Sequence, residues 1–242
     1  MGTDFAAVAG LLGHPARSAM VDALMSGEAL TAGQLAEAAG VGRSTASGHL
    51  ARLVAGGLVA VAARGRHRVH RLGGPDVAEA LEALARICPP TPVRSLRHAG
   101  DRDALGHART CYDHLAGAVG VALTDALEGR GWIGPAAGGY ALSPAGEAGL
   151  VGAGVDVAGA RAARRAFARP CLDWTERRPH LAGALGAAVA ARALAAGWVR
   201  RRAGRGVAVT PAGRDVLAGV FGVPAAVLDD GTVRHPPRAA RA

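Results

Sequence analysis

The sequence predicts a mainly α-helical protein with small β-hairpins, of the α+β class, divided into an N-terminal and a C-terminal domain. Helical periodicity with capping residues runs through the first domain, two strand-like runs around a basic turn interrupt it, and a block of the second domain occurs twice. The predicted divisions are residues 1–88 for the first domain, 89–102 for a linker, 103–228 for the second domain and 229–242 for a disordered basic tail.

The first part of the chain carries the pattern of four successive helices. Residues 5–26 hold two helical patterns, and Pro15 suits the first turn of the second of them. Thr31 is a suitable N-cap for a short helix over 32–39, and a longer helix over 44–55 follows a glycine-rich turn. The last two helices therefore form a helix, tight turn, helix arrangement.

A β-hairpin is predicted next, because the strand-like runs 58–61 and 69–72 flank the basic tip 64–68. An amphipathic helix over 76–87 then completes the first domain, and prolines stop it. The apolar stripe of this helix consists of Val77, Ala80, Leu81, Leu84 and Ile87. A helix-turn-helix followed by a hairpin is a winged helix-turn-helix, in which the hairpin forms the wing.

The second domain contains an internal repeat. One copy reads CYDHLAGAVGVALTDALEGRGWI and then YALSPAGEAGL, and the other begins CLDW and ends in VAVTPAGRDVL. Trp132 and Trp198 lie 66 residues apart (198 − 132), as do His114 and His180 (180 − 114). Each copy predicts a helix, a hairpin and a second capped helix. We therefore expect two repeated helix-hairpin-helix units, degenerate and winged-helix-like, at about 110–150 and 170–220.

The composition indicates a polyanionic partner and argues against several classes of protein. The chain has 28 Lys+Arg, all of them arginine, against 19 Asp+Glu, and its formal charge of +9 attracts phosphates. No apolar stretch approaches the ~18 to 20 residues of a membrane span. The three cysteines are not clustered and no secretory signal is recognised, so a cytoplasmic protein is expected. Nucleophile elbows and phosphate loops are not found, so no enzyme is expected.

The helix over 44–55 divides into a polar and an apolar side, as a helix lying in the major groove requires. The predicted DNA contacts are Arg43, Ser44, Thr45, Ser47, His49 and Arg52 on this helix and Arg64, Arg66 and Arg68 on the wing. The predicted buried side consists of Ala46, Leu50, Leu53 and Val54. Short hydroxyl side chains suit base edges and phosphates, and wing arginines suit phosphates or the minor groove. The alternatives are a solvated helix face, a solvated turn and, for His49, a packing role.

Residues 11–72 resemble the ArsR, or arsenical-repressor-like, family of winged helix-turn-helix regulators. The similarity rests on the opening Gly-His-Pro-x-Arg, on the recognition-helix pattern formed by Ser44, Ser47, His49 and Leu50, and on the Leu-x-x-Gly-Leu-Val turn into the wing. The resemblance implies a homodimer joined through the first and last helices of the domain. It also implies two recognition helices that face successive major grooves of DNA, and repression that a signal relieves.

The sequence departs from the metal-sensing members of that family. Those that sense arsenic or cadmium carry a thiolate pair on the helix before the recognition helix, where this chain has Thr31 and Gly33. Members that sense zinc, nickel or cobalt carry histidines on the last helix, and residues 76–87 contain none. We therefore expect no metal and no cofactor at these positions, and a signal that enters through the C-terminal domain.

Two sets of residues in the C-terminal domain are candidates for receiving a signal. Cys111 and Cys171 occupy equivalent places in the two copies, and they form a thiolate metal site or a redox disulfide if they converge. The predicted ligand pocket consists of Tyr112, His114, Trp132, Trp174 and Trp198. The alternative for both sets is burial in the core as apolar packing residues.

The function expected from the sequence is a sequence-specific, DNA-binding transcriptional regulator, a repressor whose operator binding changes with a signal at the C-terminal domain. Its expected partners are double-stranded DNA, a second copy of the chain and an unidentified small-molecule effector, with no membrane. Two alternatives stay open: a non-sequence-specific architectural DNA-binding protein, and a thiol- or metal-responsive sensor that uses Cys111 and Cys171.

Overall fold

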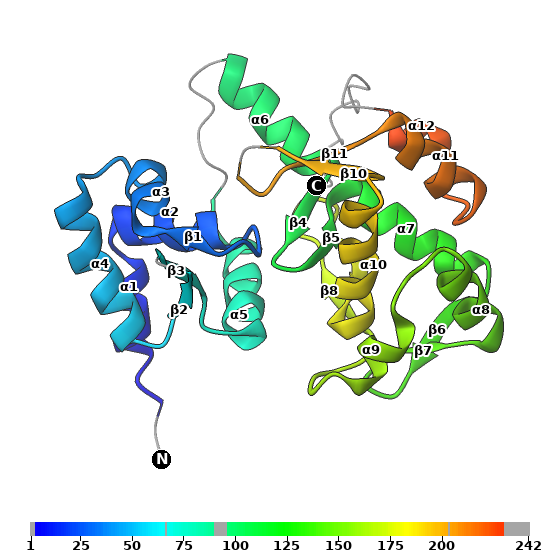
Figure 1. Cartoon of the computed structure of the whole chain (residues 1–242), viewed down its shortest axis with the longest axis horizontal. Coiled ribbons are helices and arrows are strands. Elements are labelled where there is room, and N and C mark those ends of the chain that lie inside the picture. Colours follow the sequence, from blue (N-terminus) through cyan, green and yellow to red (C-terminus); the bar gives the residue numbers. More distant parts are fainter. Residues whose placement is uncertain (1–2, 66, 90–95, 203, 230–242) are drawn as a thin grey trace, which may run out of the picture. The chain divides into compact units, whose positions relative to one another are not determined.

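The computed structural model describes residues 3–65, 67–89, 96–202 and 204–229. The chain forms two compact units, Met1–Cys88 together with Thr110–Tyr112, and Pro89–Arg109 together with Asp113–Ala242 (Figure 1). In the described part of the chain, no helix combines the length and the apolar composition needed to cross a membrane. The short strand β4 (Arg109–Cys111) is divided between the two units by this division.

The N-terminal unit is a winged helix-turn-helix, as predicted. Its elements are α1 (Phe5–Leu12), α2 (Pro15–Leu24), β1 (Leu30–Thr31), α3 (Ala32–Ala38), α4 (Arg43–Ala55), β2 (Val59–Arg64), β3 (His67–Leu72) and α5 (Pro75–Ala85). The three strands form an antiparallel sheet in the order β1-β3-β2, so the wing hairpin is extended by the short strand that precedes α3.

Local sequence signals fix where these helices begin. Thr31 caps α3 through a capping box, in which its hydroxyl accepts from the Gln34 N–H and the Gln34 side chain accepts from the Thr31 N–H. Pro15 occupies the first turn of α2, where its missing N–H costs no helical hydrogen bond. Gly40 has φ +63°, a left-handed conformation that suits glycine in the turn between α3 and α4.

The core of the N-terminal unit packs α2, α3, α4 and the sheet against one another. Met20, Leu24, Leu35 and Leu53 are all fully buried there. The predicted buried side of α4 is wrong at one position, because Val54 is 38% exposed. A step of about 100° per residue along a helix carries position 54 away from the buried face of Leu53.

The rest of the chain is a series of helices and two-stranded hairpins. The elements up to residue 162 are α6 (Leu96–His107), β4 (Arg109–Cys111), β5 (His114–Ala116), α7 (Gly117–Gly129), β6 (Ile133–Ala136), β7 (Gly139–Leu142), α8 (Pro144–Gly152) and α9 (Val157–Ala162). Those that follow are β8 (Arg169–Leu172), β9 (Pro179–Ala182), α10 (Gly183–Ala195), β10 (Val199–Arg201), β11 (Val207–Val209), α11 (Pro211–Gly219) and α12 (Ala225–Leu228). The hairpins are β4-β5, β6-β7, β8-β9 and β10-β11.

Residues 109–152 and 169–219 contain the same order of elements: hairpin, helix, hairpin, helix. The sequence had predicted a helix where the first hairpin of each stretch stands. Its strands have only three or four residues, too few for a period-2 pattern to be recognised. The predicted linker also differs from the structure, since α6 begins at residue 96, in a stretch rich in charged residues and glycine that gives little apolar periodicity. The predicted tail lies almost wholly outside the described residues.

The core of the C-terminal unit is one apolar cluster made by helices of both stretches. Leu127, Leu150, Leu185 and Leu217 are fully buried in it. Phe221 follows α11 and is also fully buried, in contact with aromatic rings from both stretches. The two stretches therefore share a single core, which fixes their hairpins relative to one another.

Candidate nucleic-acid interface and Cys-His cluster

Helix α4 presents a polar face to solvent, because its apolar residues Ala46, Leu50 and Leu53 are buried against the body of the N-terminal unit. The predicted DNA contacts on its surface are exposed, except for the half-buried His49: Arg43, Ser44, Thr45, Ser47 and Arg52. The Ser47 hydroxyl donates to the carbonyl oxygen of Arg43 at 3.1 Å. Five exposed polar side chains thus lie on the first three turns of the helix.

His49 is held at the edge of this face rather than at its centre. Its ring lies 4.4 Å from the ring of His14, measured between centroids. Partial desolvation lowers the pKa of His49, and the neighbouring charges of His14, Arg17 and Arg52 lower it further. The imidazole is therefore neutral at pH 7 and offers a hydrogen bond rather than a positive charge.

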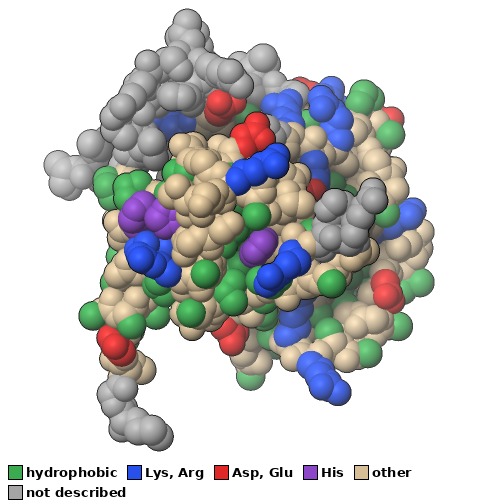
Figure 2. Space-filling view, turned by 60° about the vertical axis from the view of Figure 1, so that its left-hand side comes forward, with side chains coloured by type: hydrophobic (Ala, Val, Ile, Leu, Met, Phe, Trp, Pro, Cys, Tyr) green, Lys and Arg blue, Asp and Glu red, His purple; other side chains and the backbone are tan. Residues whose placement is uncertain are grey.

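The wing is the hairpin of β2 and β3, in which Arg64 and His67 are directly paired. Arg64 and Arg68 are exposed, and Arg66 lies outside the described residues. On the face that Figure 2 presents, basic side chains reach the surface at several separate places.

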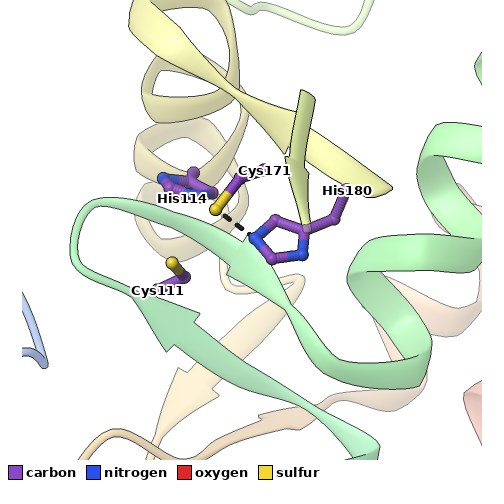
Figure 3. A group of neighbouring side chains, drawn as sticks. All are labelled: Cys111, His114, Cys171 and His180. Atoms are coloured by element: carbon purple, nitrogen blue, oxygen red, sulfur yellow. Dashed lines mark hydrogen bonds between the residues drawn. The ribbon is translucent and has the colours of Figure 1, made fainter. Parts of the chain in front are cut away.

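A second cluster of chemically active side chains lies between two hairpins, β4-β5 and β8-β9. Cys111, His114, Cys171 and His180 are all buried, and one ligand atom of each lies within 4.8 Å of those of the others. Nε2 of His114 is 3.2 Å from Nε2 of His180. Figure 3 shows the four side chains turned toward a common point, with a hydrogen bond between Cys171 and His180.

Each histidine of this cluster has a carboxylate beside its other ring nitrogen. Nδ1 of His114 is 3.2 Å from Oδ1 of Asp113, and Nδ1 of His180 is 3.2 Å from Oδ2 of Asp173. The first contact is a hydrogen bond, whereas the second is at ion-pair distance without full hydrogen-bond alignment. Arg165 binds Asp113 with an N···O distance of 2.6 Å. Both carboxylates therefore orient an imidazole ring.

Asp173 is the most strongly held carboxylate of the described residues around the cluster. Its Oδ2 accepts from the Arg109 guanidinium at 2.8 Å and from the Gly117 N–H at 2.8 Å, and both members of the ion pair are 0% exposed. Burial by itself raises the pKa of Asp173, but the contacts with His180, Arg109 and Thr175 outweigh it and hold the pKa far below its usual range. Asp173 is thus a permanent anion.

The carboxylate of Asp173 also affects the pKa of the neighbouring imidazole, that of His180. Burial lowers the pKa of His180, whereas the contacts with Asp173 and Cys171 raise it, and the net direction is upward. The buried anion therefore favours a proton or another cation on this imidazole.

The predicted aromatic pocket is not assembled. Trp132 and Trp198 pack edge-on against Phe221 at 5.9 and 5.7 Å, as core residues do. The guanidinium of Arg109 lies over the ring of Trp174, with its Cζ 4.6 Å from the ring centroid. A small hollow in the C-terminal unit is instead lined by Leu115, Gly120, Leu123, Leu181, Gly186 and Val189, none of which had been predicted. His114 belongs to the Cys-His cluster.

The sequence brought Cys111 and Cys171 forward as a pair but did not assign His180 to a site. A signal for His180 was present. His114 and His180 occupy equivalent places in the repeat, as do Asp113 and Asp173 beside the cysteines. The recurrence of a histidine in both copies therefore marks a candidate metal ligand, just as the recurrence of the cysteine does.

A helix-turn-helix whose second helix offers a polar face beside a basic hairpin defines a DNA-binding protein of the winged helix-turn-helix class. Residues 12–62 match the family described as "Helix-turn-helix domain". The HTH-type transcriptional regulator YdfF of Bacillus subtilis (strain 168) is 39% identical over 215 residues, which cover 88% of this chain and 95% of that protein. The chain therefore belongs to the HTH-type transcriptional regulators, and the winged helix-turn-helix regulator expected from its sequence is confirmed.

Solved structures that resemble part of the chain have TM-scores of 0.31. They include NolR from Sinorhizobium fredii, 28% identical over 34% of this chain and 81% of that one. The homodimeric winged helix-turn-helix domain of Mb0332 from Mycobacterium bovis is 33% identical over 34% of this chain and 74% of that one. The cadmium sensor CMTR from Mycobacterium tuberculosis is 30% identical over 38% of this chain and 100% of that one.

The buried Arg109–Asp173 ion pair predicts a large effect of Asp173→Asn on stability. Removing one charge leaves the other buried without its partner, so the free energy of unfolding should fall by about 3 to 5 kcal/mol. The matched control is Asp125→Asn, because Asp125 pairs with Arg178 at the surface, where side-chain exposures are 40% and 55%. Its loss should cost no more than about 1 kcal/mol. Denaturant titration of both variants measures the difference, and equal effects would contradict this account.

Proposed function

We propose that this regulator is a sequence-specific, cytoplasmic transcriptional repressor that reads double-stranded DNA with α4 and the β2-β3 wing. The observation that carries the proposal is the exposed face of α4, on which hydroxyl and guanidinium groups gather while its apolar side is buried. That division fits a helix whose outer surface enters a major groove and whose inner surface docks on the body.

The N-terminal turn of α4 supports this orientation. Gly42 is the N-cap and makes no side-chain capping bond, so the first backbone N–H groups are left for another acceptor. A phosphate oxygen is a suitable acceptor at a helix N-terminus, since the helix dipole favours negative charge there. Arg43, Ser44 and Ser47 lie beside this turn, where they can contact the same backbone or the adjacent base edges.

Replacing Arg43, Ser44 and Ser47 together by alanine should lower the affinity for the specific site by at least about 100-fold, if each contact contributes about 1 to 3 kcal/mol. The binding site is the duplex that the wild-type protein selects from a random-sequence library, and affinity is measured by fluorescence anisotropy. The control is Arg164→Ala, which removes an exposed guanidinium group outside α4 and the wing. A triple variant that binds the selected duplex like the wild type would refute the role of α4.

The wing arginines should contribute electrostatic affinity for DNA of any sequence, and not sequence specificity. Arg64→Ala with Arg68→Ala should weaken binding to selected and unrelated duplexes by similar factors, and should lower the slope of log affinity against log salt concentration by about 2. Titrations at several salt concentrations measure this slope. A loss confined to particular base pairs would instead assign these arginines to base reading.

We further propose that the chain acts as a homodimer joined through α1 and α5. Large apolar side chains are exposed on both helices: Phe5 (80%) and Val8 (42%) on α1, Leu84 (41%) on α5 and Ile87 (79%) just beyond its end. Exposed apolar side chains of this size on a soluble chain are typical of a contact with another protein surface. A two-fold dimer also matches the two-fold symmetry of an operator.

Leu84→Glu with Ile87→Glu should therefore convert the dimer into a monomer, because buried charges oppose the interface. Analytical ultracentrifugation measures the change in mass. The control is Val151→Glu, which alters a side chain 55% exposed on α8 in the C-terminal unit and should leave the dimer intact. A wild-type chain that sediments as a monomer would overturn the dimer proposal.

The C-terminal unit is the proposed place of signal reception, by an effector still to be identified. The match to YdfF extends well beyond the first 88 residues, so this unit is common to both regulators. Its two stretches with the same element order support the proposal that it consists of two repeated, degenerate winged-helix-like units.

A non-specific architectural protein would bind selected and unrelated duplexes equally, whereas a repressor should prefer its operator by about 10³-fold or more.

A further inference from the structure

We propose that Cys111, His114, Cys171 and His180 form a tetrahedral Cys₂His₂ site for one divalent transition-metal ion of the zinc class. The site lies between hairpins β4-β5 and β8-β9, far along the chain from the positions that metal-sensing ArsR proteins use. It does not depend on the DNA-binding proposal, because the ligands are outside α4 and the wing.

The distances in the cluster fit the size of a tetrahedral zinc site. Bond lengths of about 2.0 to 2.1 Å to nitrogen and about 2.3 Å to sulfur place two nitrogens about 3.4 Å apart and two sulfurs about 3.8 Å apart in a tetrahedron. The two Nε2 atoms are 3.2 Å apart, and the ligand atoms of all four residues lie within 4.8 Å of one another. Small side-chain adjustments therefore suffice to bring all four atoms to bonding distance of one ion.

The orientation of the imidazoles adds a second argument. Asp113 and Asp173 face the Nδ1 atoms of His114 and His180, which favours a proton on each Nδ1. In the neutral rings both Nε2 atoms then carry a lone pair, and they lie 3.2 Å apart inside a buried site. An ion between them can bind both lone pairs. A carboxylate behind each ligating histidine is also the usual support of a zinc-bound imidazole.

The backbone prepares the four ligands before any ion binds. Cys171 and His180 are directly paired across β8 and β9, and Cys111 and His114 flank the two-residue loop of the other hairpin. Tyr112 in that loop has φ +60°, a conformation that tightens the turn. Each hairpin therefore supplies one thiol and one imidazole, and the shared core of the C-terminal unit holds the hairpins together.

Two glycines make room for the imidazoles. A Cβ atom built at Gly186 would lie 3.3 Å from Cβ of His114, and one built at Gly120 would lie 3.7 Å from Cβ of His180. The Cβ atom built at Gly186 would also lie 2.4 Å from the carbonyl oxygen of Leu181, and the one built at Gly120 would lie 2.5 Å from that of Leu115, so a larger residue at either position would displace the adjoining strand. The glycine in each stretch thus approaches the histidine of the other.

The donor set selects the kind of metal. Two thiolates and two imidazoles suit zinc, cobalt or cadmium, whereas magnesium and calcium require oxygen ligands. With four protein ligands and full burial there is no open position for water or substrate, so the ion would link the two hairpins and would not catalyse a reaction. On binding, each thiol loses its proton to solvent and each imidazole binds as the neutral form.

Cobalt is the probe, because its visible spectrum reports both geometry and sulfur ligation. The reduced, metal-free full-length chain should bind one cobalt ion with the intense visible bands of tetrahedral coordination and a thiolate-to-cobalt charge-transfer band. Zinc should displace the cobalt and abolish both. Cys171→Ser should lose about half of the charge-transfer intensity or fail to bind, whereas Cys88→Ser, which alters an exposed cysteine, should behave like the wild type.

A second measurement on the wild-type chain covers the case in which a variant does not fold. Zinc at saturating concentration should raise the melting temperature of the metal-free chain, and a chelator should reverse the increase. Three results would overturn the proposal: no cobalt bound by the reduced chain, weak octahedral bands without charge transfer, or a Cys111–Cys171 disulfide in protein purified under reducing conditions. Each is independent of DNA binding, so none of them bears on the repressor proposal.

Discussion

A fully buried ion pair between Arg109 and Asp173 organises the C-terminal unit. Arg109 opens strand β4 and Asp173 follows strand β8, so their 2.8 Å contact joins the two hairpins that face each other. Asp173 also accepts from the Gly117 N–H at the start of α7 and faces the ring of His180. Because a buried charge is costly without a partner, the ion pair favours one arrangement of the two hairpins. That arrangement sets the relative positions of the four Cys-His cluster residues.

The N-terminal unit was predictable because its information is local. Capping residues, a proline at a helix start and period-3.6 apolar stripes fix α2, α3 and α4 within a few residues, and each depends on neighbours along the chain. The limit of this reasoning appears at Val54, where a correct helix still gave a wrong burial. The outline of an apolar stripe does not say where the packed surface ends.

The C-terminal cluster was predictable only in part, because it depends on which hairpins meet. The repeat made Cys111 and Cys171 equivalent, but equivalence in sequence does not establish closeness in space. The three-residue strands β4 and β5 left no periodic signal, so the sequence placed His114 on a helix and in an aromatic pocket. The tryptophans of that pocket instead pack on Phe221, because burying large rings against each other fills the core.

The two stretches of the C-terminal unit give a physical reason for holding two similar copies in one chain. One hairpin offers a single thiol and a single imidazole, and two ligands do not close a tetrahedral site around an ion. A second, similarly built hairpin adds the complementary pair at no cost of association, since both belong to the same chain. The aspartate that orients each imidazole stands two residues after a cysteine, so one Cys-x-Asp pattern provides both a ligand and a support. The two similar hairpins of one chain thus supply together the ligands that neither hairpin supplies alone.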